Sequence, residues 1–171
     1  MKESVLITGG AGYIGSVLAE MLLDKGYKVT VLDNLLYKQT SLLHLCDDKN
    51  FTFVKGDVTN NKEFLPRIIN HDIIIPLAAI VGAPACDANP GLATAINFSQ
   101  IQFIVDNLRK DQKLIMPNTN SQYGSSDEII TEDFPFNPLS HYAKTKCKAE
   151  DYIMDWDNGI CLRLATVFGS S

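Results

Sequence analysis

Residues 5–15 read VLITGGAGYIG, an apolar run that passes directly into a cluster of glycines. The run predicts a short buried strand, and apolar residues recur at helical spacing after the glycines. The glycines fit both G-x-G-x-x-G and G-x-x-G-x-x-G. A strand, a glycine-rich turn and a helix in this order are typical of a loop that binds the phosphates of a dinucleotide. We therefore interpret this segment as the start of a dinucleotide-binding α/β domain.

The residues of this turn have different expected roles. Gly9 allows a turn that a Cβ would block, Gly12 lets the backbone approach a pyrophosphate, and Gly15 lets helix and strand pack closely. Tyr13 and Ile14 lie in the first turn of the expected helix, where free N–H groups and the positive end of the helix dipole face an anion. The turn is the predicted phosphate-binding site.

Apolar runs and helical patterns alternate along the rest of the chain. Further strands are expected at 28–32, 51–54, 73–75, 113–116 and 160–164, and further helices at 40–45, 60–69, 91–108 and 140–156. The segment 81–90 is too rich in prolines and glycine for a helix, and 125–138 reads as a polar loop. The alternation predicts a doubly wound (Rossmann) α/β fold: a parallel sheet of about six to seven strands, with helices on both faces.

An acidic residue, Asp33, ends the second expected strand, about 20 residues past the glycines. A carboxylate at this position is placed to accept hydrogen bonds from the ribose hydroxyls of adenosine. Asn34 follows, and no arginine lies near to bind a 2′-phosphate, which favours NAD over NADP. An ordinary turn at the end of a strand would also account for this aspartate.

Two other strand ends are expected to border the cofactor. Asp57 follows the third expected strand, where it either meets the adenine amino group or stabilises a turn. Leu77, Ala78 and Ala79 follow the fourth strand, and small side chains there let a cofactor pass close to the backbone.

Tyr142 and Lys146 are four residues apart in the helix expected over 140–156, so they share one face. A tyrosine of ordinary pKa, about 10, is a poor base at neutral pH, and a nearby ammonium lowers that pKa. The pair therefore suits proton removal from an alcohol as its hydride leaves, with Thr119 orienting the alcohol from the end of the fifth strand. An ordinary exposed pair on a helix is the alternative, and the glycine turn favours the catalytic interpretation.

Composition excludes several functional classes. The chain has 171 residues, 46% hydrophobic and 20% charged, as expected for one globular domain. A net charge of −5 without a basic cluster argues against nucleic acid as a partner, and no apolar run approaches the ~20 residues of a membrane helix. Four widely spaced cysteines match no zinc pattern, so we expect no metal site, reduced thiols and a cytoplasmic location.

In these motifs the chain resembles the extended short-chain dehydrogenase/reductase superfamily, in its nucleotide-sugar epimerase/dehydratase branch. The matching segments follow the family's order: Thr8–Gly15, Asp33-Asn34, Gly56–Val58, Leu77–Ala79, Asn97, Thr119–Gly124, Tyr142–Lys146 and Arg163–Gly169. The resemblance implies NAD as cofactor and an NDP-sugar as substrate. It also implies oxidation at C4 of the sugar, followed by return of the hydride.

Individual roles follow from the same resemblance. Tyr142 would be the catalytic base and acid, Lys146 would tune it and hold the nicotinamide ribose, and Thr119 would hydrogen-bond the sugar hydroxyl. Val58 would flank the adenine, and Asn97 belongs to the expected cofactor-binding residues. The two long helices, 91–108 and 140–156, predict a homodimer by analogy.

Two departures from the family refine the prediction. Related dehydratases have Thr-Asp-Glu where this chain has Thr119-Asn120-Ser121, and neutral side chains cannot act as the acid and base that remove water. This favours an NAD-dependent nucleotide-sugar epimerase, with an NDP-sugar 4-dehydrogenase/reductase as the alternative. Relatives also continue into a substrate domain. Residues 1–171 are therefore expected to be an NAD-binding Rossmann domain with the C-terminal substrate domain essentially absent, which leaves a non-catalytic NAD-binding module open.

Overall fold

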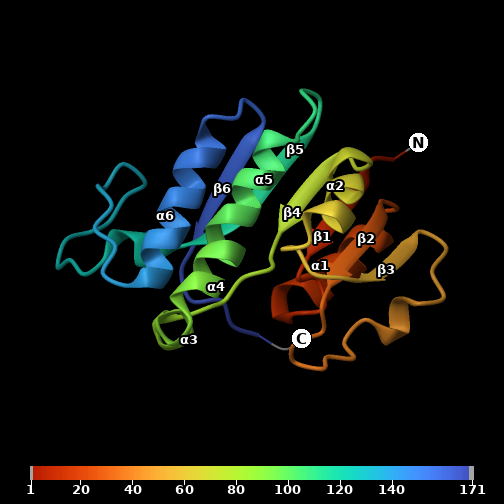
Figure 1. Ribbon diagram of the computed structural model, residues 1–171, viewed down its shortest axis with the longest axis horizontal. Coiled ribbons are helices and arrows are strands. Elements are labelled where there is room, and N and C mark those ends of the chain that lie inside the picture. The colour runs from red at the N-terminus through yellow and green to blue at the C-terminus, as the bar shows by residue number, and fades with distance from the viewer. Residues whose placement is uncertain (1, 170–171) are drawn as a thin grey trace.

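The computed structural model describes residues 2–169, so Met1, Ser170 and Ser171 of the expected domain lie outside the described residues. Six parallel strands form one sheet in the order β3-β2-β1-β4-β5-β6 (Figure 1). The strands are β1 (Ser4–Thr8), β2 (Lys28–Asp33), β3 (Phe51–Lys55), β4 (Ile73–Pro76), β5 (Lys113–Thr119) and β6 (Gly159–Leu164).

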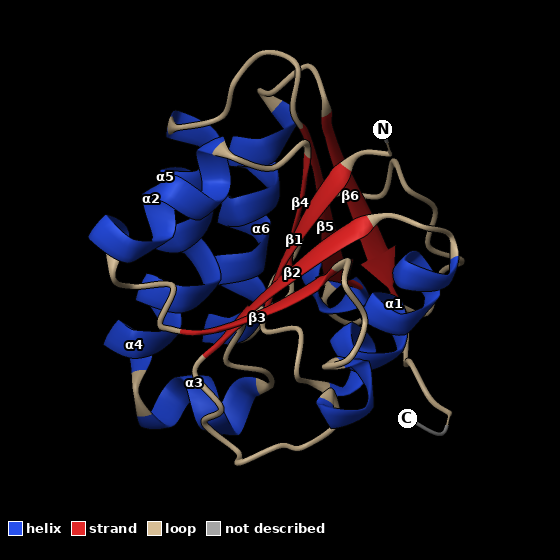
Figure 2. Ribbon diagram, turned by 90° about the vertical axis from the view of Figure 1, so that its right-hand side faces the viewer, coloured by secondary structure: helices blue, strands red, loops and turns tan. Residues whose placement is uncertain are grey.

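Helices cover both faces of this sheet. They are α1 (Tyr13–Asp24), α2 (Asn61–Ile69), α3 (Ala83–Ala88), α4 (Pro90–Thr94), α5 (Gln100–Asp106) and α6 (His141–Met154). Figure 2 shows α2, α5 and α6 on one side of the sheet and α1 on the other. The predicted doubly wound α/β fold is therefore confirmed, with six strands.

The core consists of two apolar layers, one on each face of the sheet. On one face Leu6 belongs to a cluster with Phe64 of α2 and Ile153 of α6. On the other face Ile7 belongs to a cluster with Ala19 of α1. Successive side chains of a strand point to opposite faces, and because both faces are covered the central residues of β1, Val5–Ile7, are all apolar.

The strand order reverses at β1, with β2 on one side and β4 on the other. Thr8, the last residue of β1, pairs with Leu32 of β2 and with Pro76 of β4. In open α/β sheets a crevice forms outside the carboxyl ends of the strands at such a reversal. The residues that follow these strands therefore gather at one edge of the sheet.

Two predictions of short segments are wrong. The segment 81–90 contains α3, because Pro84 lies in the first turn of this helix, where a missing N–H removes no hydrogen bond. The helix expected at 40–45 is only the 3₁₀ turn η1 (Leu43–Leu45). Ser41 caps no helix; its hydroxyl donates a hydrogen bond to the carbonyl of Ala11 at 2.8 Å.

The long helix predicted over 91–108 is interrupted. Between α4 and α5 the backbone forms η2 (Ala95–Ser99), a π-helical turn, and α5 ends at Asp106. A π turn inserts an extra residue into the helical repeat and is frequent at functional sites. Apolar periodicity does not reveal it, because both sides of the insertion still face the core.

Candidate functional site

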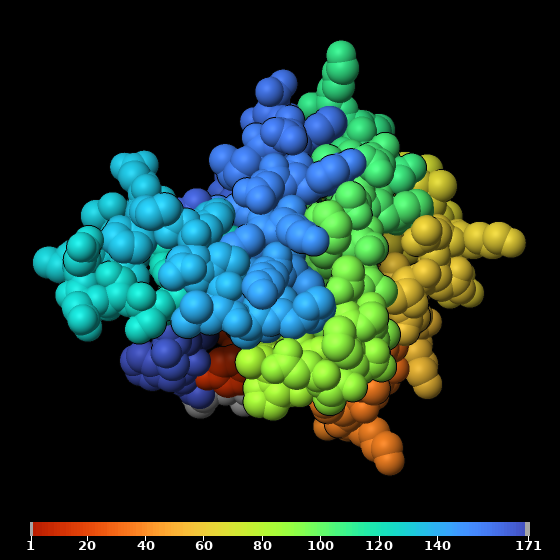
Figure 3. Space-filling model, turned by 60° about the vertical axis from the view of Figure 1, so that its left-hand side comes forward, coloured from red at the N-terminus to blue at the C-terminus, as the bar shows by residue number. Residues whose placement is uncertain are grey.

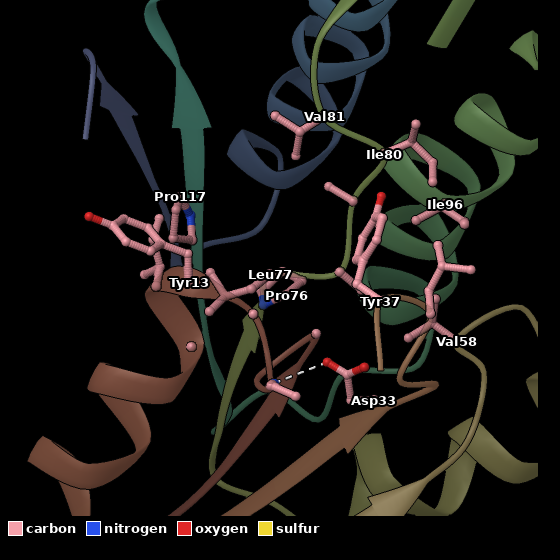
Figure 4. A pocket seen from close by; sticks show the side chains of 18 of the residues that line it. Tyr13, Asp33, Tyr37, Val58, Pro76, Leu77, Ile80, Val81, Ile96 and Pro117 are labelled. Carbon is pink, nitrogen blue, oxygen red and sulfur yellow. Dashed lines mark hydrogen bonds between the residues drawn. The ribbon is translucent and has the colours of Figure 1, made fainter. Parts of the chain in front are cut away.

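A cavity of about 950 Å³ opens at the carboxyl ends of the strands (Figure 4). Its wall includes all the site residues predicted above except Asn97: Gly9, Gly12, Tyr13, Ile14, Gly15, Asp33, Asn34, Asp57, Val58, Leu77, Ala78, Ala79, Thr119, Tyr142 and Lys146. The fold thus brings the glycine turn, the strand ends and the Tyr142/Lys146 helix to one hollow, although they are far apart in the sequence.

The glycine turn is sterically closed on its inner side. Gly9 has a φ of +66°, and a Cβ there would lie 2.6 Å from the backbone nitrogen of Ala78. A Cβ on Gly15 would lie 2.5 Å from the Cα of Gly10. Both contacts are with backbone, which cannot swing aside, so these positions require glycine.

The cavity side of the turn is open. Gly12 is the N-cap of α1, and no side chain caps this helix. A Cβ on Gly12 would approach the carbonyl oxygen of Gly9 at 3.2 Å and no other atom within 4 Å. The first-turn N–H groups of a helix have no partner within the helix, so α1 presents donors and a positive dipole end to the cavity.

Asp33 lies on the cavity wall at the end of β2, almost fully buried (8% exposed). Its Oδ2 accepts a hydrogen bond from the backbone N–H of Ala11 at 3.0 Å, drawn as a dashed line in Figure 4. Its Oδ1 accepts one from the N–H of Leu35 at 2.8 Å. The residue therefore stabilises a turn, the alternative considered from the sequence, and it also lines the cavity, where its predicted contact with ribose hydroxyls stays a prediction.

Asp57 combines a turn and a cavity position in the same way. Its Oδ1 accepts hydrogen bonds from the backbone N–H and the hydroxyl of Thr59, at 2.8 and 2.7 Å. Its Oδ2 accepts one from the side-chain amide of Asn34 at 3.3 Å. The bonds from Thr59 lower the pKa of Asp57, so it is ionised at neutral pH.

The segment after β4 is held from behind by η2 and α5. The side chain of Asn97, 2% exposed, accepts from the N–H of Ile80 at 2.8 Å and donates to its carbonyl at 2.9 Å. Gln100 donates to the carbonyl of Ala78 at 2.9 Å. The structure therefore does not bring Asn97 to the cavity wall: its amide is used to position the backbone that forms the wall.

The Asn97 amide also donates to the hydroxyl of Thr145 at 3.4 Å. That hydroxyl in turn donates to the carbonyl of Tyr142 at 2.7 Å. The segment after β4 is in this way connected to α6 through buried hydrogen bonds. The part played by Gln100 was missed from the sequence, because it depends on the π turn.

Helix α6 begins where its sequence predicts. The Ser140 hydroxyl accepts from the N–H of Ala143 at 3.1 Å and caps the helix. Tyr142 and Lys146 follow on the face toward the cavity, and the ammonium of Lys146 donates to the carbonyl of Pro117 at 3.3 Å. Thr119, at the end of β5, lines the same part of the cavity.

Burial dominates the electrostatics of this group. It raises the pKa of Tyr142, the nearby Cys86 thiol raises it further, and the Thr119 side chain lowers it. The predicted lowering of the Tyr142 pKa by Lys146 is therefore wrong for the chain as described. Burial lowers the pKa of Lys146 to about 8, although Cys161 and Glu150 act in the opposite direction.

Sequence reasoning also missed part of the apolar wall. Figure 4 shows Tyr37, Ile80, Val81 and Ile96 beside the predicted residues. Tyr37, Ile80 and Val81 lie in loops and Ile96 lies in η2, and none of the four belongs to a recognised motif. In the sequence, only their closeness to the end of a strand could have indicated a place in the cavity wall. Their rings and methyl groups provide an apolar surface for a planar ring.

Two further features are absent from residues 2–169. No helix of this part is long and apolar enough to cross a membrane. In the same residues, no group of three or more His, Cys, Asp and Glu side chains is arranged to hold a metal ion.

Comparison with known proteins adds three findings. The model of the NAD dependent epimerase/dehydratase family matches residues 5–171. A UDP-N-acetyl-alpha-D-glucosaminuronate decarboxylase of Bacillus cytotoxicus is 33% identical over 78% of this chain and 41% of its own length. An uncharacterised UDP-glucose epimerase of Bacillus subtilis is 31% identical over 96% of this chain and 57% of its own length.

Among solved structures, UDP-glucuronic acid 4-epimerase of Bacillus cereus in complex with NAD is similar, with a TM-score of 0.80 and 29% identity. The similarity covers 97% of this chain and 57% of that structure. The chain thus spans about half the length of the relatives it matches.

Proposed function

Because this chain belongs to the NAD dependent epimerase/dehydratase family, we propose that its cavity binds NAD and that the protein is a nucleotide-sugar epimerase. In this proposal the sugar of an NDP-sugar is oxidised transiently at C4. The observation that carries it is the meeting of the glycine turn with Thr119, Tyr142 and Lys146 in one cavity. The complex of the Bacillus cereus relative with NAD supports the choice of cofactor.

The residues of the cavity wall suit the successive parts of NAD. The open N-terminus of α1 at Gly12 suits the diphosphate, and the buried carboxylate of Asp33 suits the ribose hydroxyls of adenosine. Asp57 and Val58 would flank the adenine, and Ala78 lies where the cofactor would continue toward α6. When bound, NAD supplies the acceptor for the hydride.

The remaining chemistry belongs to side chains of this protein. Tyr142 would take the proton of the C4 hydroxyl and return it, while Thr119 orients that hydroxyl. Burial raises the pKa of Tyr142, and Lys146 does not offset this rise in the chain as described, so the phenol is neutral until cofactor and substrate occupy the cavity. The protonated ammonium of Lys146, on the same helix face, would hold the nicotinamide ribose beside Tyr142.

Epimerisation fits the sequence better than removal of water. Asn120 and Ser121 occupy the positions after Thr119, and neither is a general acid or base near neutral pH. The matching decarboxylase shows that the family contains other reactions, so an NDP-sugar 4-dehydrogenase/reductase is the second candidate.

Two measurements on the 171-residue chain test this proposal. Calorimetric titration with NAD tests the cofactor, and we expect saturable binding of one NAD per chain. Incubation with NAD and UDP-glucose, followed by NMR of the sugar, tests the reaction, and formation of the C4 epimer would exclude a non-catalytic module. Binding without turnover would favour a non-catalytic NAD-binding module, and no affinity for NAD or NADH would contradict the proposal altogether.

We also propose a cytoplasmic homodimer built on one cofactor-binding domain. The helices α5 and α6 lie side by side on one face, where a second copy can pack (Figure 3). All four cysteines are free, as expected in a reducing compartment. Light scattering at micromolar concentration is expected to give twice the mass of the chain, and a monomeric mass would contradict the dimer.

A further inference from the structure

A third functional group lies on the face of α6 that carries Tyr142 and Lys146. Glu150 follows Lys146 by four residues and is 3% exposed. A buried carboxylate is costly unless it is paired and hydrogen-bonded. The role of this carboxylate rests on the function proposed for Lys146.

Each oxygen of the Glu150 carboxylate has a partner. Its Oε1 accepts hydrogen bonds from Nε of Arg163 at 2.7 Å and lies 2.6 Å from Nη2 of the same guanidinium. Its Oε2 accepts from Nδ2 of Asn118 at 2.5 Å. The charge of Glu150 is thus fixed between β6 on one side and β5 on the other.

Arg163 is itself held on every side. Its Nη1 donates to the hydroxyl of Tyr123 and to the carbonyl of Glu132, both at 2.6 Å. Its guanidinium carbon lies 4.7 Å from the centre of the Phe136 ring, within the range of a cation–π contact. The polar loop over 125–138, which stands out from the surface in Figure 3, is therefore anchored to the same ion pair.

Asn118 connects the ion pair to the proposed catalytic residues. Its Nδ2 also lies 3.3 Å from the carbonyl of Lys146, and it immediately precedes Thr119 in β5. The residue before it, Pro117, accepts the hydrogen bond of the Lys146 ammonium. Glu150 therefore affects Lys146 through its charge. It affects the position of Thr119 through its hydrogen bond with Asn118, the preceding residue of β5.

The charges around Lys146 are unequal in effect. Of the groups that raise its pKa, Glu150 is the one held in an ion pair with Arg163, whereas Cys161 is a neutral thiol, because burial raises its pKa to about 12. Tyr142 and Cys147, the other titratable groups beside it on α6, have raised pKa values and are also neutral. From β6, the guanidinium of Arg163 pairs with Glu150, and its positive charge is expected to offset part of the effect of the carboxylate, because a nearby like charge disfavours the charged form of a lysine.

We propose that Glu150, fixed by Arg163 and Asn118, is a positioning residue that holds Lys146 in its charged form and holds the Thr119 end of β5 against α6. Glu150 touches neither the cavity nor any reacting atom in this account. Glu150 and Arg163 carry opposite charges. Loss of Glu150 is therefore expected to lower the fraction of Lys146 that is protonated at a given pH, and loss of Arg163 is expected to raise it.

The titration of Lys146 tests this balance in the 171-residue chain. Lysine labelled with ¹³C at Cε is followed by NMR against pH, and Lys146→Arg identifies the signal. In Glu150→Gln we expect a midpoint lower by about one pH unit, the low end of the effect of a neighbouring opposite charge. In Arg163→Met we expect a higher midpoint, because Glu150 then acts on Lys146 without compensation.

Opposite signs separate this role from a merely structural one. Both variants remove one member of a buried pair and are expected to destabilise the fold, so denaturant unfolding is measured alongside. Shifts of the same sign, or no shift in either variant, would overturn the proposal. Glu128→Gln, an exposed acid in the polar loop, is the matched control and leaves the midpoint in place.

If Glu150→Gln does not fold, the two Arg163 variants carry the test, and a midpoint that does not rise in Arg163→Met overturns the proposal. Arg163→Lys keeps the positive charge and is expected to restore the midpoint of the original chain, whereas Arg163→Met does not. This readout needs neither NAD nor sugar. Opposite shifts without NAD binding would contradict the proposed function alone, and NAD binding without opposite shifts would contradict this inference alone.

Discussion

The two halves of the cavity are built on different principles. The half formed by β1, α1 and β2 depends on backbone: Gly9 and Gly15 fit because they have no side chain, and the helix presents bare N–H groups. The half formed by β5, α6 and β6 depends on charged side chains: Lys146 and Glu150 are buried, and Glu150 pairs with the partly buried Arg163. In Figure 1 these halves lie on opposite sides of β4.

This difference teaches what can perturb each half. Steric requirements do not change with pH, so the backbone half is sensitive to added atoms and insensitive to protonation. Buried charges respond to pH through their shifted pKa values, so the side-chain half is sensitive to protonation.

Gly9→Ala should abolish most of the cofactor affinity. The φ of +66° is unfavourable for alanine, and the new Cβ would meet the backbone of Ala78 at 2.6 Å, so the turn must move. Strain of about 3 kcal/mol corresponds to a loss of about 100-fold in NAD affinity, measured by calorimetry. This loss should be the same at pH 7 and pH 9.

Gly91→Ala is the matched control for that variant. Gly91 lies in α4, and the nearest atom to an added Cβ is the Asn89 Oδ1 at 3.9 Å, an ordinary contact. We expect unchanged NAD affinity. Equal losses in both variants would show that the Gly9 turn has no special role.

Lys146→Met should remove a pH dependence of stability. Burial lowers the pKa of Lys146 to about 8 from its ordinary 10.5, so between these pH values the unfolded chain binds more protons than the folded one. The free energy of unfolding therefore gains about 3 kcal/mol from this group as pH rises from about 8 to 10.5. Denaturant unfolding of both proteins across this range measures the difference between them.

The pH profile of the original chain must be compared with that of Lys146→Met, because Cys161 changes the free energy of unfolding with pH in the opposite direction. Burial raises the pKa of this thiol to about 12, so stability falls with pH as the thiol of the unfolded chain ionises. Parallel pH profiles for the two proteins would contradict the account of Lys146.

Asp33→Asn should weaken NAD binding about tenfold. The amide keeps the shape of the side chain but loses the charge that strengthens hydrogen bonds from ribose hydroxyls, an effect of about 1.5 kcal/mol. Titration of the variant with NAD measures this loss, and Asp127→Asn, on an exposed loop residue, is the control. An unchanged affinity would mean that Asp33 only stabilises its turn.

Gln100→Leu should have the smallest effect. The Nε2 of Gln100 donates to the carbonyl of Ala78, and its buried Oε1 has no partner within the described residues. The substitution removes this hydrogen bond but also removes the unsatisfied oxygen, so the two effects on stability partly cancel. We expect a change in unfolding free energy below about 1 kcal/mol and a change of two- to threefold in NAD affinity. A loss comparable to that of Gly9→Ala would show that the wall after β4 matters as much as the glycine turn.

The two halves also differ in how well the sequence predicts them. The glycine turn is a local motif, and its conformation follows from residues that are neighbours in the chain. The strands followed from apolar runs for the same reason. The actual role of Asn97, the pairing of Glu150 with Arg163 and the raised pKa of Tyr142 depend on burial between distant segments, which periodicity and motif spacing do not contain.

The central claim is that both halves serve one cofactor, and a crystal structure of the chain with NAD tests it most directly. We predict the diphosphate at the N–H groups of the first turn of α1, and the nicotinamide beside Tyr142 and Lys146. A structure with the diphosphate away from the glycine turn, or with the nicotinamide outside the Tyr142 side of the cavity, would contradict the claim.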